Sequence, residues 1–172
     1  MPYPAIVIAN EFIELAKRGG NTLTPLKLQK LVYFAHGWCL ALTGRALISD
    51  GVQAWQYGPV IPSIYHEFKA VGNGPVTKPA SGMFNISGLR FFNGPATLDN
   101  YPDNEERREA KEIVARVFAM YDKYSAARLS NATHQYGTPW QLVYQEGQRG
   151  LTISNDLIRS YFRGVAANAP GK

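Results

Sequence analysis

Cysteine is the scarcest chemically reactive residue in this 172-residue sequence, and Cys39 is its single copy. One cysteine cannot form an internal disulfide, so a reduced compartment suits the chain. The amino terminus has no basic leader before its short apolar run, which Asn10, Glu11 and Glu14 interrupt. A secretory signal peptide is therefore not expected, and we predict a cytoplasmic location.

Long apolar runs are also missing. No uninterrupted stretch approaches the roughly 20 residues that a helix needs to cross a bilayer, so no membrane partner is predicted. The chain is nevertheless 45% hydrophobic and 12% aromatic, which is too apolar for a disordered polypeptide. Its length is close to that of an ordinary single domain. We therefore predict one globular domain.

The common signatures of catalysis are absent as well. The sequence contains no G-x-S-x-G elbow, no glycine-rich phosphate loop, and no H-E-x-x-H or EF-hand pattern. His36 and Cys39 could offer two metal ligands from one helix, but a zinc site would also need His66 or His134. We predict no metal, no cofactor and no enzymatic activity. A small metal- or Cys/His-dependent enzyme using His36, Cys39 or His134 is the alternative.

Positive charge exceeds negative charge, with a formal net charge of +5 and a pI near 9.3. This excess permits attraction to nucleic acid or to an acidic protein. Its densest part, residues 105–123, interleaves basic and acidic side chains at the spacing of helical ion pairs. The pattern favours a solvated helix over a nucleic-acid-binding stripe. Binding of the protein to its own promoter DNA stays an alternative hypothesis.

Helical periodicity dominates the chain. Apolar spacing together with start and stop signals predicts helices before Gly19-Gly20, over 25–43, over 62–71, from Asp103 or Asn104 to Tyr121, from Ser125 toward His134, and from Ser154 to Gly164. Pro139 is expected to initiate a short turn. The fold class is therefore mainly α, with about six helices around one core. Residues 165–172 are predicted to form a disordered tail.

Two regions depart from this helical pattern. Residues 52–57 are rich in β-favouring types and predict a short strand, which Gly58-Pro59 ends. Residues 72–102 are rich in Gly, Pro, Asn and Ser, and their apolar residues recur at strand-like intervals. These apolar residues predict a small hairpin at Phe84, Ile86, Leu89, Phe91 and Phe92.

Two runs are specific enough to suggest a family. The sequence reads LTPLKLQKLVYFAHGW at 23–38 and AWQYGPV at 54–60, followed by Tyr65 and Phe68. Joined in this order, the runs resemble the Panacea domain, also called the SocA-like antitoxin domain, whose members include proteins described as phage-associated. The resemblance continues more loosely through Leu129, Ser130, Thr133, His134 and Pro139-Trp140 to the last helix. It predicts a single domain over 1–164.

The resemblance implies a mostly helical protein that neutralises a toxin encoded beside it, or that delivers the toxin to a protease as an adaptor. The implied partners are therefore a cognate toxin and, for an adaptor, a protease complex. The family brings no agreed catalytic residues. Our candidate partner-binding residues are four residues of the second helix that lie off its main apolar stripe and two aromatic residues beside them. They are Lys27, Gln29, Lys30 and Tyr33, with Trp55 and Tyr57.

Overall fold

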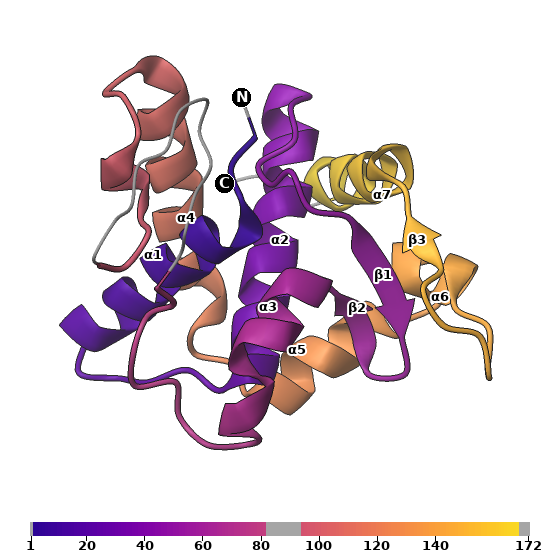
Figure 1. The fold of residues 1–172 in the computed structure, drawn as a ribbon. Helices are drawn as coiled ribbons and strands as arrows, with labels where there is room; N and C mark the ends of the chain where they lie inside the picture. The colour runs from indigo at the N-terminus through magenta and orange to yellow at the C-terminus, as the bar shows by residue number, and fades with distance from the viewer. Residues whose placement is uncertain (1, 82–93, 169–172) are drawn as a thin grey trace.

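The computed structural model describes residues 2–81 and 94–168 (Figure 1). The central element of the fold is the helix α2, which spans Pro25–Thr43. The predicted fold class, mainly α with minor β, is confirmed. The elements in chain order are α1 (Ala5–Arg18), α2 (Pro25–Thr43), β1 (Val52–Trp55), β2 (Gly58–Val60), α3 (Pro62–Phe68), η1 (Lys69–Val71), η2 (Leu98–Asn100), α4 (Glu105–Tyr121), α5 (Ala126–Thr133), α6 (Pro139–Val143), β3 (Thr152–Ile153) and α7 (Asn155–Ala167).

The bounds of α2 follow from its caps. The Thr24 hydroxyl accepts from the backbone N–H of Lys27 at 3.3 Å, and Pro25 occupies the first turn, where its missing N–H costs nothing. Gly44 ends the helix in the left-handed conformation, with φ of 74°. Helices α1, α3, α4, α5 and α7 all pack on α2, so it is buried on nearly every side.

A small antiparallel sheet lies beside α2, with strand order β2-β1-β3. In the β1–β2 hairpin, Gln53 pairs with Val60 and Trp55 pairs with Gly58, which leaves Gln56 and Tyr57 as the two turn residues. Strand β3 pairs with the other edge of β1. The sequence did not predict β3, because two residues are too few to show an alternating pattern.

The charged helix predicted over 105–121 is α4, which begins after its cap Asn104. Its cations lie against acidic side chains: Arg116 pairs with Glu112 at 2.5 Å, and Arg107 pairs with Asp103 at 3.0 Å. The Arg116–Glu112 pair has the expected spacing within the helix, whereas the partner of Arg107 precedes the helix.

The carboxyl end of the chain corrects one prediction. Helix α7 does not end at Gly164 but continues to Ala167, because Gly164 keeps a negative φ and does not form a left-handed cap. Residues 165–167 are therefore helical rather than part of a disordered tail. The hairpin predicted at 84–92 and the tail residues 169–172 lie outside the described residues. No helix in the described part of the chain combines the length and apolarity needed to span a membrane.

Candidate partner-binding turn

The hairpin between β1 and β2 carries an exposed aromatic surface. Tyr57, at its tip, is 68% exposed, and Gln56 beside it is also exposed. The Trp55 ring is half-buried and packs edge-on against Tyr65, with 4.8 Å between ring centroids. Tyr65 is itself 42% exposed. These side chains project from residues 55–59, called the 55–59 turn below, and from the adjoining first turns of α3.

Two polar side chains hold the 55–59 turn from below. The Nζ atom of Lys30, on α2, donates to the carbonyl oxygens of Tyr57 at 2.8 Å and of Pro59 at 3.1 Å. The hydroxyl of Ser130, on α5, donates to the same Tyr57 carbonyl at 2.9 Å. The backbone on both sides of Gly58 is therefore tied to two helices.

Two aromatic side chains contact the first half of the same turn. The indole N–H of Trp140, on α6, donates to the Trp55 carbonyl oxygen at 2.7 Å. The His134 ring, which follows α5, lies with Nε2 3.3 Å from the Gln56 carbonyl oxygen and Nδ1 2.6 Å from the Ser130 carbonyl oxygen. Its ring also packs on Trp140, with centroids 3.9 Å apart. Internal side chains thus contact four of the turn's five carbonyl oxygens.

Gly58 is required at this point for two reasons. Its φ is +103°, a backbone conformation that L side chains rarely adopt. A Cβ atom at Gly58 would also lie 2.5 Å from Nζ of Lys30 and 2.6 Å from Oγ1 of Thr133. The Lys30 amine therefore occupies space that only a glycine leaves open.

Lys30 is a fully buried lysine. None of the ion pairs among residues 2–81 and 94–168 involves it, and its hydrogen-bond partners there are the two carbonyl oxygens. Burial disfavours the charged form and lowers the pKa of Lys30 to about 7.

Gln29 and Lys30, two of the candidate partner-binding residues, do not lie on the surface. Both side chains are buried, because β2, α3 and α5 pack on the face of α2 that the sequence appeared to leave free. Gln29 Nε2 donates to the Ile61 carbonyl, and its Oε1 accepts from the Ile61 N–H, each at 3.0 Å. Gln29 and Lys30 therefore support the hairpin from within and do not form its surface.

Tyr33 and Lys27 lie apart from the 55–59 turn. Tyr33, another candidate, is buried, and its ring packs against Phe34 and Phe162. Lys27 is half-buried and binds Asp122 between α4 and α5, donating to its carbonyl at 2.6 Å and pairing with its carboxylate at 2.9 Å. Of the six predicted residues, Trp55 and Tyr57 are those that reach the surface at the turn.

A protein-family model described as "Antitoxin SocA-like, Panacea domain" matches residues 28–141, which is most of the chain. The chain belongs to this family. The matched region holds the 55–59 turn together with Lys30, Ser130, His134 and Trp140. Residues 130–140 appeared only in the looser part of the sequence resemblance, where nothing indicated that they contact this turn.

A curated relative extends the match over nearly the whole chain. The protein is 32% identical over 163 residues to "Antitoxin SocA" of Caulobacter vibrioides (strain NA1000 / CB15N), covering 92% of this chain and 82% of the relative. No solved structure matches. The sequence resemblance to the Panacea domain is therefore confirmed.

The residues considered for catalysis have structural partners in this Panacea domain. His36 is buried, with Nε2 2.9 Å from Oδ1 of Asn155, and burial lowers its pKa. The Cys39 thiol lies 3.7 Å from the Thr43 hydroxyl, and burial raises its pKa, which disfavours the reactive thiolate. Within the described ranges, no three His, Cys, Asp or Glu side chains gather in a way that could hold a metal.

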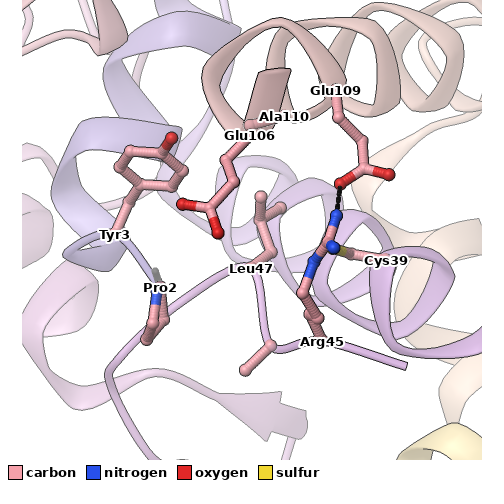
Figure 2. A pocket seen from close by; sticks show the side chains of 9 residues that line it. Pro2, Tyr3, Cys39, Arg45, Leu47, Glu106, Glu109 and Ala110 are labelled. Carbon is pink, nitrogen blue, oxygen red and sulfur yellow. Dashed lines mark hydrogen bonds and ion pairs between the residues drawn. The ribbon is translucent and has the colours of Figure 1, made fainter. Parts of the chain in front are cut away.

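A pocket of about 280 Å³ lies near the carboxyl end of α2, between α4 and the amino-terminal segment (Figure 2). Tyr3, Cys39 and Leu47 are among its lining residues. Arg45 reaches toward α4 and forms an ion pair with Glu109, which Figure 2 shows as a dashed line. This ion pair neutralises the charges of two side chains that line the pocket. The lining residues do not form a recognisable set of catalytic side chains. The 55–59 turn is therefore the stronger candidate site.

Proposed function

We propose that this member of the SocA-like antitoxin family neutralises a toxin by binding it directly through the surface of the 55–59 turn. Family membership and the 32% identity to an antitoxin support the antitoxin role. The observation that carries the choice of surface is the exposed Tyr57 ring on a backbone whose carbonyls are contacted from inside the protein.

The turn has the physical properties of a binding hot spot. Tyrosine and tryptophan are enriched in such positions because a large, rigid ring contributes contact area at a small entropic cost. A loop already held in one conformation loses less freedom on association, so more of the contact energy appears as affinity. Because the carbonyls of Trp55, Tyr57 and Pro59 have side-chain donors within the protein, a partner would be recognised mainly by the projecting side chains, foremost Tyr57.

Co-expression with the product of the adjacent gene tests this function. The unaltered protein should restore growth of cells making that product and should copurify with it. Tyr57→Ala should reduce copurification at least about tenfold, because a central aromatic hot spot contributes about 2 kcal/mol or more. The matched control is Leu42→Ala, which removes a 64% exposed side chain near the other end of α2.

Two results of this experiment would contradict different parts of the proposal. Rescue and copurification by the Tyr57→Ala variant at the unaltered level would reject the 55–59 turn as the interface. An unaltered protein that neither rescues nor copurifies would reject direct neutralisation of that gene product.

Direct binding is compatible with two modes of neutralisation, occlusion of the toxin and delivery of the toxin to a protease. The mode we propose first is occlusion, because the rigid turn can fill a site on the partner without any further component. Purified antitoxin should then inhibit the purified toxin in the absence of protease. A toxin that stays active in the purified complex, but whose lifetime in cells shortens when the antitoxin is present, would support the adaptor mode instead.

A further inference from the structure

Lys30 is an exception to the usual rules of burial. Lysine is almost never fully buried without a charged partner, because removing an ammonium group from water carries a large free-energy penalty. In this protein the side chain is fully buried, and its Nζ bonds are to neutral backbone carbonyls. The surrounding core does not need an amine to fill this space.

An apolar side chain of similar length would fill the same volume without that penalty. Removing the amine has a cost of its own, because the buried Pro59 carbonyl would lose its side-chain donor. The penalty of burying the ammonium group and the gain from its hydrogen bonds oppose each other, so folding stability alone does not account for Lys30. Residues that break the usual rules of burial in folded proteins are expected mainly at functional sites.

A lysine does one thing at this position that an apolar residue cannot do. Its amine lies below Gly58 and bonds to the carbonyl oxygens on either side, those of Tyr57 and Pro59. The amine has three N–H donors when charged and two when neutral, so it can bind both carbonyls in either form. Three consecutive backbone units are thereby fixed beneath the exposed Tyr57 ring.

We propose that Lys30 is a positioning residue for partner recognition, which holds the 55–59 turn in its binding conformation. This inference rests on the proposed function of the turn. It predicts that removing the amine weakens binding far more than it changes folding stability.

The test compares two lysine variants, Lys30→Met and Lys17→Met. Lys17 is an exposed lysine on α1, a helix that supplies no residue to the 55–59 turn, so it is the control. At pH 6, Lys30→Met should melt within a few degrees of the unaltered protein. NMR order parameters of the Tyr57 and Gly58 amides should fall from about 0.85 toward about 0.6. Affinity for the co-expressed toxin should fall at least tenfold.

The control should leave the order parameters and the toxin affinity unchanged. A Lys30→Met protein that unfolds, or that melts well below Lys17→Met, would overturn the inference, because Lys30 would then serve stability. Unchanged order parameters, or mobile amides with unchanged affinity, would overturn it too. Ser130→Ala, which removes the second donor to the Tyr57 carbonyl, should loosen the turn by a smaller amount. A turn that is looser in Ser130→Ala than in Lys30→Met would overturn the inference, because Ser130 would then be its main support.

The NMR measurements need no partner, so they separate this inference from the proposed function. If the unaltered protein binds no toxin while Lys30→Met loosens the turn, the proposed function fails and the positioning of the backbone by Lys30 stands.

Discussion

At the scale of single residues, the buried amine of Lys30 makes folding stability depend on pH in a defined direction. The pKa of the Lys30 amine is about 7 in the folded protein, compared with 10.5 for an ordinary lysine, which is the value taken for the unfolded chain. Between these values the unfolded chain binds a proton that the folded protein has released, so the free energy of unfolding rises with pH. Below pH 7 both states hold the proton, and Lys30 contributes no pH dependence.

This pH dependence can be isolated by urea unfolding of the unaltered protein and Lys30→Met from pH 7 to 8.5. The free energy of unfolding of the unaltered protein should rise relative to the variant by about 1.5 kcal/mol over this window. Burial also raises the pKa of the Cys39 thiol, but this residue is the same in both proteins, so its ionisation in the unfolded chain cancels in the comparison. Parallel pH profiles for the two proteins would show that the Lys30 pKa is not lowered.

The residue scale is also where sequence reasoning was least successful. Gln29 and Lys30 are polar residues next to an apolar stripe, and such residues are usually exposed. A helix covered on nearly all sides leaves no free face, so polarity alone could not indicate their environment. Trp55 and Tyr57 were placed correctly near a surface because they border a glycine-proline turn, a local signal that tertiary packing did not override.

At the scale of elements, the close contact of α2 with α7 depends on Gly37. A Cβ atom at this position would lie 2.3 Å from the Phe162 ring. Gly37→Ala should therefore destabilise the protein by about 1–3 kcal/mol, as overpacking of a core does. Gly164→Ala is the matched control, because a Cβ there would meet no described atom within 4 Å and Gly164 lies within a helix.

Urea unfolding measures both glycine variants. Gly164→Ala should stabilise the protein by about 0.5–1 kcal/mol through the lower flexibility of the unfolded chain. Adding Phe162→Leu to Gly37→Ala should cost less than the same change made in the unaltered protein, because the two residues compete for one space. Additive effects of Gly37→Ala and Phe162→Leu would contradict this description of the helix pair.

Elements with capping signals were predictable from the sequence. Thr24, Ser125 and Ser154 each precede the first residue of a helix, and each hydroxyl accepts a hydrogen bond from a backbone N–H of the first turn. The end of α7 was not predictable, because Gly164 can either end a helix or continue one. Which of the two occurs depends on the φ angle of Gly164, which the sequence does not show.

At the scale of the whole molecule, the candidate site is assembled from segments far apart in the sequence. Lys30 and Ser130 both donate to the Tyr57 carbonyl. Lys30 is 27 positions from Tyr57 in the sequence, and Ser130 is 73 positions from it. The helices that supply these groups could be predicted from local periodicity. Their convergence could not, because it depends on how α2 and α5 pack together, and periodicity describes each helix separately.

One side chain joins equally distant parts of the fold. Asn10, buried on α1, donates through Nδ2 to the carbonyl oxygens of Ala80 at 2.9 Å and of Ala96 at 2.8 Å. Its Oδ1 accepts from the Ala80 N–H at 2.8 Å. The positions that it joins are 70 and 86 residues away, and they adjoin the bridge between Ser81 and Pro95.

Asn10 therefore offers a test of whether the predicted single domain unfolds as one cooperative unit. Asn10→Ala leaves buried carbonyl and N–H groups without partners and should lower the free energy of unfolding by about 3 kcal/mol, since each such group costs about 1–3 kcal/mol. Asn131→Ala, which changes an exposed asparagine on α5, should have little effect.

The decisive comparison is between two optical probes of urea unfolding. Helical circular dichroism reports on all the helices, and tryptophan fluorescence reports on Trp38, Trp55 and Trp140, whose indoles are not the groups that Asn10 hydrogen-bonds. In a cooperative domain both transitions shift together in Asn10→Ala, because removing an interaction anywhere destabilises the one folded state. If only the circular dichroism transition moved, α1 with its attached segment would be unfolding separately, and the 55–59 turn would belong to a smaller unit around α2, α5 and α6.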